Sequence, residues 1–493
     1  MSLYGGVELV GRPDLENVRK LDLLPLPQIA RMERVGIGID LDYLARVGSD
    51  FDSLMAKYQR EISNYIPQEA LDQFVSGDLD EDGESSIEIN ANSAQQIRQL
   101  LFSLLNISSE GLKQTDAGLV STGKKNLEMR RSDHEVVPLV LAYREVSKLK
   151  SFCKSLPKFA KFHNQGECLV CERHHANAHH RLHGQILTTR AETGRLSMKK
   201  PNLQQIPKRS KLGRRIRAAF IAPPGRRLVS VDFSQMELRD LAHLANASSM
   251  IQVYWDNQDI HTFTACRAFG KDYDHYADLA FREQSLTGTE KLDWEDFAAN
   301  MRLPSKNLNF MIVYGASWKG LQAQLALSGI YWDEATCKDF IQRWFGLYPE
   351  VNDYLNTQEY RARRYGCVWT PCGRIRLVPE IRSCHPYKRS EGVRQAGNMP
   401  VQGANAEQTK LVMGELEEEY EHMRAAGIDV EALLPIHDEI ISETDEEQAE
   451  VIGDSIIAPV FRNVMVDKQT GENLWRVPIN ADAKVSERWA KVA

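Results

Sequence analysis

Two aspartates far apart in the chain interrupt apolar sequence, where a carboxylate is costly. Asp232 follows the apolar run LVSV, and Asp438 separates two apolar runs in LLPIHDEIISE. The first run predicts a buried strand that ends near Asp232, and the second stretch predicts two strands joined beside Asp438. Two carboxylates brought together from distant strands repel each other unless a cation lies between them. The open question is therefore what pairs with Asp438.

Magnesium is the cation that such a pair suits best. Mg²⁺ takes a few carboxylate ligands and keeps positions open for substrate phosphate oxygens. Two such ions about 4 Å apart can hold the attacking and leaving oxygens of a phosphoryl transfer. For either aspartate taken alone, a helix N-cap or a turn is the commoner role.

A second group of residues repeats at helical spacing. In RLPSKNLNFMIVYG, Arg302, Lys306, Phe310 and Tyr314 recur every four residues. Each such step turns a helix by only about 40°, so the side chains would form a stripe of two cations followed by two rings. Cations suit a triphosphate, and flat rings suit a base or sugar. Pro304 places Arg302 at or just before a helix N-terminus, which also favours phosphate, although an amphipathic helix with a basic end is the alternative.

Two further stretches carry arginines and amides among small residues. TGRLSMKKPNLQQIP (193–207) would suit the sugar edge or minor groove of a duplex, and RQAGNMPVQ (394–402) enters a predicted helix. Residues 199–217 hold eight basic residues and no acidic one, although the net charge of the chain is −7. Such a patch suits a polyanion, but a solvated basic loop explains it equally well.

Composition places the chain among ordinary folded proteins. It has 493 residues, of which 42% are hydrophobic, so we expect more than one domain. The eight cysteines are scattered, which indicates reduced thiols in a cytosol. No apolar run reaches the ~18 residues of a membrane span, and the N-terminus has no signal pattern. Residues 168–183 contain a Cys-x2-Cys and five histidines, but their spacing fits no common zinc finger.

Hydrophobic periodicity predicts a mixed α+β chain. An acidic stretch, Gly77–Ser86, is expected to be a mobile surface loop. Residues 167–198 are expected to form short strands and turns, and residues 366–380 a hairpin that turns at Gly373. The predicted helices are 21–36, 44–66, 93–105, 134–160, 236–245, most of 259–358, 403–425 and a segment near 445–463. The predicted single strands are 37–40, 228–233 and 475–484.

The motifs DFSQMELR, R-x3-K-x3-F-x3-YG and HDE, in that order, resemble motifs A, B and C of the family A DNA polymerases, the bacterial DNA polymerase I type. MERVGIGID, YREVSKLK, TGRLSMKKPNLQQIP, DIHT, GRIRLVPE and NMPVQG extend the resemblance from about residue 20 to the C-terminus. The resemblance implies a right-hand fold with an antiparallel-sheet palm, a helical thumb and helical fingers. It implies palm at 1–43, thumb at 44–155, palm at 156–258, fingers at 259–402 and palm at 403–493.

The implied reaction is template-directed addition of dNMP from dNTP to a primer 3′ end, in DNA replication or repair. Two Mg²⁺ ions, which Mn²⁺ could replace, would be held by Asp232, the carbonyl of Phe233 and Asp438. The implied catalytic residues are Asp232, Asp438, Glu439, Lys306 and Arg302. The implied dNTP-binding residues are Gln235, Glu237, His261, Arg302, Lys306, Phe310 and Tyr314. The implied DNA-binding residues are Arg195, Asn202, Gln205, Arg394, Asn398, Gln402 and His437.

The resemblance also implies two substrate preferences. Glu237 would lie under the sugar C2′, where a 2′-OH has no room, so ribonucleotides would be rejected. Phe310 has no ring hydroxyl to replace a missing substrate 3′-OH, so dideoxynucleotides would be poor substrates and Phe310→Tyr would improve their use.

The polymerase-like pattern starts within about 20 residues of Met1. No exonuclease or 5′ nuclease domain is therefore expected before it in this chain. An excised domain, a proofreading partner chain and the absence of proofreading all remain open, and a compact phage or plasmid gene fits. The expected partners are primer–template DNA, dNTPs and a separate exonuclease, helicase or processivity factor. We expect a monomer in the cytoplasm of a bacterial cell or phage-infected host, with no membrane contact.

Three other functions remain as alternatives. A single-subunit RNA polymerase would share the palm chemistry, but Glu237 and Phe310 argue against it. A metal-dependent nuclease could use Asp232, Asp438 and Glu439, but it would not need the stripe from Arg302 to Tyr314. A non-catalytic DNA-binding subunit could use residues 199–217 and would bind with strong salt dependence.

Overall fold

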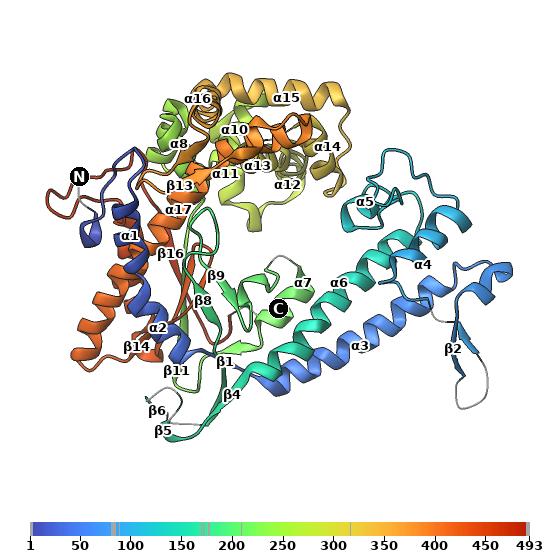
Figure 1. Ribbon diagram of the computed structural model, residues 1–493, viewed down its shortest axis with the longest axis horizontal. Helices are drawn as coiled ribbons and strands as arrows, with labels where there is room; N and C mark the ends of the chain where they lie inside the picture. The colour runs from blue at the N-terminus through green and yellow to red at the C-terminus, as the bar shows by residue number, and fades with distance from the viewer. Residues whose placement is uncertain are drawn as a thin grey trace. The chain divides into compact units, whose positions relative to one another are not determined.

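The computed structural model describes residues 3–79, 85–87, 89–168, 170, 173–175, 178–208, 210–315 and 317–489 (Figure 1). These residues divide into two compact units. The first unit holds residues up to Gly38, Lys161–Gln205 and Ile221–Trp489, and the second holds Ile39–Ala160 and Ile206–Phe220. Helices and antiparallel strands occur together, which confirms the predicted α+β class. Within the described residues, no helix has both the length and the apolar composition needed to cross a membrane.

A four-stranded antiparallel sheet forms the centre of the first unit. Its strand order is β14–β15–β11–β16, with bounds Val430–Ile436, Glu439–Asp445, Arg226–Phe233 and Ala481–Ser486. Strands β14 and β15 are buried almost throughout. Their apolar residues, such as Leu434 and Ile440, belong to the core, and the buried Glu443 is paired with Arg181 and Arg226. Both strand predictions around the two aspartates are confirmed. The last strand begins at Ala481, later than the predicted 475, and Pro478 in the intervening stretch cannot donate a ladder hydrogen bond.

Helix α17 is much longer than the sequence indicated. It spans Pro386–Ala425, whereas the predicted helix began at residue 403. Pro400, which cannot donate a backbone hydrogen bond, lies inside the helix and is buried. Arg394, Asn398 and Gln402 therefore do not precede the helix. They recur every four residues within it and share one face.

Helices dominate residues 259–358, as predicted. Helices α10 (Ile260–Phe269), α13 (Leu303–Ile312) and α15 (Glu334–Leu347) pack around one another in the first unit (Figure 1). The other helices of this part of the unit are α8 (Met236–Ala245), α9 (Ser248–Trp255), α11 (Tyr273–Phe281), α12 (Gly288–Phe297), α14 (Trp318–Ala326) and α16 (Pro349–Tyr365).

The beginning of the chain differs in detail from the prediction. The expected single helix is split at Pro25 into α1 (Leu15–Leu23) and α2 (Leu26–Val35). Gly36 ends α2 with a φ of 67°, and β1 (Ile37–Ile39) follows, both as predicted. The hairpin of β12 (Cys367–Trp369) and β13 (Ile375–Leu377) is also confirmed. Short strands and turns fill the range predicted for them: β5 (Gly166–Cys168), β6 (Arg173–His175), β7 (His179–Leu182), β8 (Gln185–Leu187) and β9 (Ser197–Lys199). Two strands were not predicted, β4 (Ala160–His163) and β10 (Phe220–Ile221), and the helix predicted to reach residue 160 ends at Ser155, shortly before Pro157.

The second unit is built on two long helices. Helices α3 (Leu41–Ser63) and α6 (Val136–Ser155) run side by side (Figure 1). The unit also contains α4 (Ala94–Arg98), α5 (Lys124–Glu128), α7 (Lys211–Arg217), β2 (Val75–Leu79) and β3 (Ser85–Ile87). The ends of the predicted acidic loop thus lie in strands, and residues 80–84 lie outside the described part. This unit contains the predicted thumb, and the five-part division of the chain stays a prediction.

The remaining segments of the first unit are short. The helical segment predicted near 445–463 consists of α18 (Ala449–Ile452), a π-helical turn at Gly453–Ile457 and α19 (Ala458–Arg462).

Candidate active site

The two aspartates singled out in the sequence lie at the same end of the central sheet. Strands β14 and β15 are joined by the two-residue turn His437–Asp438, and His437 has a φ of 59°. Such a tight turn needs a left-handed residue, which makes the position of Asp438 well defined. On the neighbouring strand β11, Asp232 pairs in register with Glu439. We call Asp232 and Asp438 the carboxylate pair.

Asp438 is buried beside a like charge. Burial and the charge of Asp232 raise the pKa of Asp438 to about 7, and Glu237 adds to the effect while Arg195 opposes it. This is the electrostatic behaviour of two carboxylates that share one site. A divalent cation would reverse it, so the donor set fits a hard metal ion. No group of three or more histidine, cysteine or acidic side chains arranged to hold a metal occurs among the described residues, so a pair and backbone oxygens are what this site offers.

Glu439 lies beside the pair but is held by other groups. The Ser230 hydroxyl donates to Glu439 Oε1, and Trp489 Nε1 donates to the same oxygen at 3.4 Å. These hydrogen bonds hold the carboxylate toward β11. The implied catalytic role of Glu439 stays a prediction.

Glu237 is the centre of a polar network. It lies in the first turn of α8, as predicted. Arg195 Nη2 donates to its Oε1 at 2.5 Å, and Tyr314 OH lies 3.0 Å from its Oε2. Gln402 Nε2 in turn donates to Tyr314 OH at 3.0 Å. Burial and the Glu237 charge raise the pKa of Tyr314, so this hydroxyl stays protonated and donates. The structure thus brings together four of the predicted site residues.

Arg302 is held by residues that the sequence analysis did not single out. Its Nε and Nη2 donate to Asp259 Oδ2 at 3.0 and 2.7 Å, and its Nε also lies 2.9 Å from Thr262 Oγ1. Burial alone would raise the pKa of Asp259, but the charges of Arg302 and His261 and the Thr262 hydrogen bond outweigh it and lower the pKa. We call Arg302, Asp259, Thr262 and His261 the Arg302 cluster.

The expected helix N-terminus at Arg302 is not a free helix end. A π-helical turn, Ala298–Arg302, runs directly into α13, and Leu303 N donates to Ala298 O. Backbone N–H groups that would bind phosphate at a free N-terminus are partly used within this continuous helical path. The prediction of a helix-end phosphate site is therefore wrong, and the side chain of Arg302 carries the positive charge.

The other predicted residues are less constrained. Lys306, Phe310 and Gln205 are exposed, and the Phe310 ring lies 5.3 Å from His261. Asn202 Oδ1 accepts from Gln204 N at 3.1 Å. Gln235 has a φ of 53°, and its side chain accepts a long hydrogen bond from the Tyr254 hydroxyl. Arg394 donates to Ser390, and Asn398 lies half-buried on α17.

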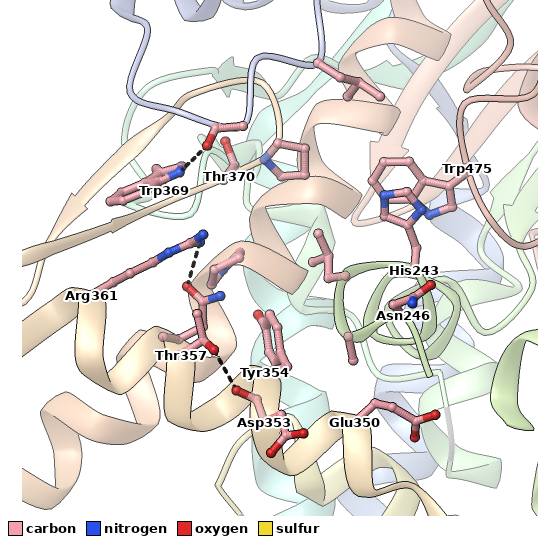
Figure 2. Close-up of a pocket in the computed structure, with 17 residues that line it drawn as sticks. His243, Asn246, Glu350, Asp353, Tyr354, Thr357, Arg361, Trp369, Thr370 and Trp475 are labelled. Carbon is pink, nitrogen blue, oxygen red and sulfur yellow. Dashed lines mark hydrogen bonds between the residues drawn. The ribbon is translucent and has the colours of Figure 1, made fainter. Parts of the chain in front are cut away.

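A pocket of about 560 Å³ lies elsewhere in the first unit and contains none of the predicted site residues. Figure 2 shows His243 stacked on Trp475, with their ring centroids 3.5 Å apart, across the pocket from Arg361 and Trp369. The guanidinium of Arg361 lies 4.6 Å from the Trp369 ring. The first contact joins α8 to the segment before β16, and the second joins α16 to β12.

Sequence reasoning missed Asp259, Thr262 and Asn309. Asp259 is the N-cap of α10, and its side chain accepts from His261 N and Thr262 N. The stretch DIHT carried a signal, because an aspartate before a helical run is a typical N-cap. Its second role toward Arg302 depends on a contact between distant segments, which no local pattern reveals.

Comparison with known proteins identifies the family. The family model described as DNA polymerase family A matches residues 78–491. The chain is 31% identical over 466 residues to DNA polymerase I of Rhizobium leguminosarum, covering 94% of this chain and 39% of that protein. It is 32% identical to the thermostable DNA polymerase I of Thermus thermophilus, covering 94% of this chain and 47% of that protein. The chain thus spans less than half the length of these two relatives.

A solved structure agrees with the sequence comparison. The polymerase domain of Pol1 from M. smegmatis, in complex with DNA primer–template and dNTP, superposes with a TM-score of 0.74 at 26% identity. The match covers 96% of this chain and 72% of that chain. The family model covers most of the chain, and the mixed fold agrees with this neighbour. The chain belongs to DNA polymerase family A.

Proposed function

We propose that this chain is a template-directed DNA polymerase that adds dNMP from dNTP to a primer 3′ end. The observation that carries the proposal is the carboxylate pair, in which burial and a like charge raise the pKa of Asp438 to about 7. In a family A chain, such a pair at the end of an antiparallel sheet suits phosphoryl transfer between nucleotides. The relatives named above are DNA polymerases, and the structural neighbour holds DNA and dNTP.

Carboxylate and carbonyl oxygens suit a hard cation, so we assign the residues that carry them at this site as the metal ligands. Asp232, Asp438 and the carbonyl of Phe233 would hold two Mg²⁺ ions, which Mn²⁺ could replace, and the ions would supply positive charge to the phosphate oxygens. Glu439 would support this site, and hydrogen bonds from Ser230 and Trp489 hold its carboxylate in place.

The chain's own side chains bind and orient the nucleotide. Arg302 and Lys306 bind the triphosphate, and the salt bridge to Asp259 orients the Arg302 guanidinium before the nucleotide arrives. Gln235 and His261 assist at the phosphates. Phe310 packs on the sugar and base, and Tyr314 lies where the template base enters.

Glu237 selects the sugar. Its carboxylate is held from two sides by Arg195 and Tyr314, so it cannot swing away to make room for a 2′-OH. Rejection of ribonucleotides then follows from steric exclusion by a fixed group.

The primer–template is bound by groups from three segments. Arg394, Asn398 and Gln402 form one face of α17, and His437 lies at the β14–β15 turn. Arg195, Asn202 and Gln205 complete the set from residues 195–205. Side chains of these types suit phosphate and sugar-edge contacts. We assign the sheet to a palm, residues 259–402 to fingers and 44–155 to a thumb, and we place the enzyme in replication or repair in a bacterial or phage-infected cytoplasm.

Extension of a labelled DNA primer on a DNA template with Mg²⁺ tests the proposal. Parallel reactions contain dNTPs or rNTPs, and the variants are Asp438→Ala and a matched control, Asp339→Ala, at an exposed position on α15. We expect extension with dNTPs only, lost in Asp438→Ala and kept in Asp339→Ala. No extension by the folded wild-type protein would overturn the proposal, and primer shortening would favour a nuclease.

A further inference from the structure

A buried polar chain lies behind His261. Trp344 Nε1 donates to Asn309 Oδ1 at 2.6 Å, and Asn309 Nδ2 lies 3.0 Å from His261 Nδ1. Asn309 and His261 are only 1% and 3% exposed, and Trp344 is fully buried. These residues come from α15, α13 and α10, the three helices that pack around one another. A buried hydrogen-bond chain of this kind fixes the direction of each donor.

The direction of the Asn309 amide follows from both ends of the chain. The indole N–H of Trp344 can only donate, so the group facing it is the amide oxygen. At the other end, Thr264 Oγ1 donates to Ile260 O at 2.7 Å and lies 2.8 Å from Tyr348 OH, where either hydroxyl can be the donor. Asn309 Nδ2 lies 3.3 Å from Thr264 Oγ1 and donates to it, in agreement with the direction set by Trp344. Both ends place the amide nitrogen on the side of His261.

The amide direction determines the histidine tautomer. Because Asn309 Nδ2 donates to His261 Nδ1, that ring nitrogen carries no proton, and the neutral ring carries its proton on Nε2. Among the described residues, His261 Nε2 makes no hydrogen bond. The ring therefore keeps one N–H group available for a ligand.

The charges around His261 favour the neutral ring. Burial lowers the pKa of His261 to about 4, Asp259 opposes this, and Arg302 and Lys306 add to it. These are the charged groups that face the ring from α13 and from the N-cap of α10, and the uncharged Phe310 ring lies 5.3 Å away. A neutral donor is thus present throughout the range in which polymerases are assayed.

We propose that Asn309, oriented by Trp344, is a positioning residue that fixes His261 as the Nε2–H tautomer, so that His261 donates a hydrogen bond to the triphosphate of the incoming nucleotide. The hydrogen bond from His261 to the triphosphate rests on the proposed function, whereas the positioning of His261 by Asn309 does not. A donor fixed in advance needs no proton rearrangement when the nucleotide binds.

Nitrogen-15 NMR of histidine-labelled protein measures the tautomer directly. The His261 signals are assigned by their loss in His261→Gln. We expect Nδ1 of the wild type to be unprotonated and Nε2 to be protonated from about pH 6 to pH 9. A protonated Nδ1, or a mixture of tautomers, would overturn the proposal without any need for a variant to fold.

Asn309→Asp reverses the hydrogen bond without a change of size. A carboxylate accepts from Nδ1–H, so it favours imidazolium at low pH and the Nδ1–H tautomer at high pH. Above the new pKa the Nε2 lone pair would face the phosphates, and dNTP binding should weaken about tenfold. Lowering the pH should restore binding, because imidazolium again donates from Nε2. The wild type should show no such pH dependence of dNTP affinity.

Controls separate this effect from damage to the fold. Asn307→Asp adds the same charge two residues earlier on α13, and it should leave the His261 tautomer unchanged. Trp344→Phe keeps the ring but removes the N–H, and a second tautomer should appear, whereas Trp332→Phe should have no effect. Affinity is measured as dNTP binding to a complex with a dideoxy-terminated primer, beside KM and kcat.

The outcomes distinguish the two halves of the proposal. An unchanged tautomer in Asn309→Asp would overturn the positioning role. A switched tautomer with unchanged dNTP affinity would overturn the donation to the triphosphate. The predicted tautomer in a wild-type protein that extends no primer would contradict the proposed function and leave the positioning of His261 intact.

Discussion

The carboxylate pair and the Arg302 cluster both lie in the first unit, but the pair brings like charges together and the cluster brings opposite charges together. Asp232 and Asp438 are like charges held together by two strands, and burial with the charge of Asp232 raises the pKa of Asp438 to about 7. In the Arg302 cluster the charges are opposite, and the pKa of Asp259 is lowered. In the proposed function, the first region receives a cation, whereas the charges of Arg302 and Asp259 in the second region are paired with each other.

The difference shows how the two regions receive their ligands. A buried carboxylate beside a like charge gains free energy when a cation binds, so we propose the pair as the metal site. A satisfied cluster gains less from a new ligand but holds its donors in place beforehand. We therefore expect variants of the carboxylate pair to affect chemistry and metal binding, and variants of the Arg302 cluster to affect nucleotide affinity.

The largest effect should come from Asp438→Asn. Removal of one carboxylate leaves too little negative charge for the metal ions, so the rate of primer extension should fall on the order of a thousandfold or more. Single-turnover extension measures the rate, and Asp339→Asn at an exposed position on α15 serves as the matched control. An Asp438→Asn variant that retains most of the extension rate would contradict the claim that the carboxylate pair is the reacting centre.

Glu237→Ala should change sugar selection next most strongly. The carboxylate held by Arg195 and Tyr314 would be gone, and the space under C2′ would admit a hydroxyl. The preference for dNTP over rNTP, measured as the ratio of kcat/KM values, should drop about a hundredfold. Unchanged discrimination would mean that another group excludes ribonucleotides.

The carboxylate pair also predicts an unusual pH dependence of stability without metal. The pKa of Asp438 is 3.8 as an ordinary carboxyl and about 7 when folded, so the folded state retains a proton that the unfolded chain loses. The contribution of Asp438 to the free energy of unfolding should be fully present below about pH 4 and be lost as the pH rises through 7, which is opposite in sign to the contribution of Asp259. At pH 8, Asp438→Asn should be more stable than wild type by about 2 kcal/mol in EDTA.

Denaturant unfolding of both proteins at pH 5 and pH 8 tests this effect. The gain should shrink at pH 5, where the wild-type carboxyl is protonated, and it should shrink when Mg²⁺ is added at pH 8. A gain of equal size under all three conditions would mean that the effect is one of packing rather than of charge.

Asp259→Asn should have the smallest effect, on nucleotide affinity. Asparagine keeps the N-cap of α10 but removes the charge that orients Arg302. KM for dNTP should rise about tenfold with little change in kcat. A fall in KM would show that Asp259 competes with the triphosphate for Arg302, and it would contradict the view of the cluster as arranged in advance.

Local pattern predicted the parts of the site that lie within one element. The strands around Asp232 and Asp438 follow from β-branched apolar runs, and Glu237 follows from the strand-to-helix change after Phe233. Local pattern did not reveal the first part of α17, because burial in the folded chain outweighs the free-energy cost of Pro400 inside a long helix. It also failed at Arg302, where a π-helical turn extends the helical path past the expected start.

Partners from distant segments could not be predicted from the sequence. The hydrogen bonds of Arg302 with Asp259 and of Asn309 with Trp344 join residues 43 and 35 positions apart. No sequence periodicity links residues at these separations, because each contact depends on how α10, α13 and α15 pack. The sequence therefore indicated candidate site residues but not the side chains that hold them in place.

Proton release on metal binding tests the central claim most directly. Mg²⁺ or Mn²⁺ is titrated into metal-free protein at pH 6, and the heat is compared in buffers of different ionisation enthalpy. The account predicts release of about one proton as the cation ionises Asp438, and no such release in Asp438→Asn. Metal binding without proton release, or equal release by the variant, would contradict the claim that the carboxylate pair is a site completed by a cation.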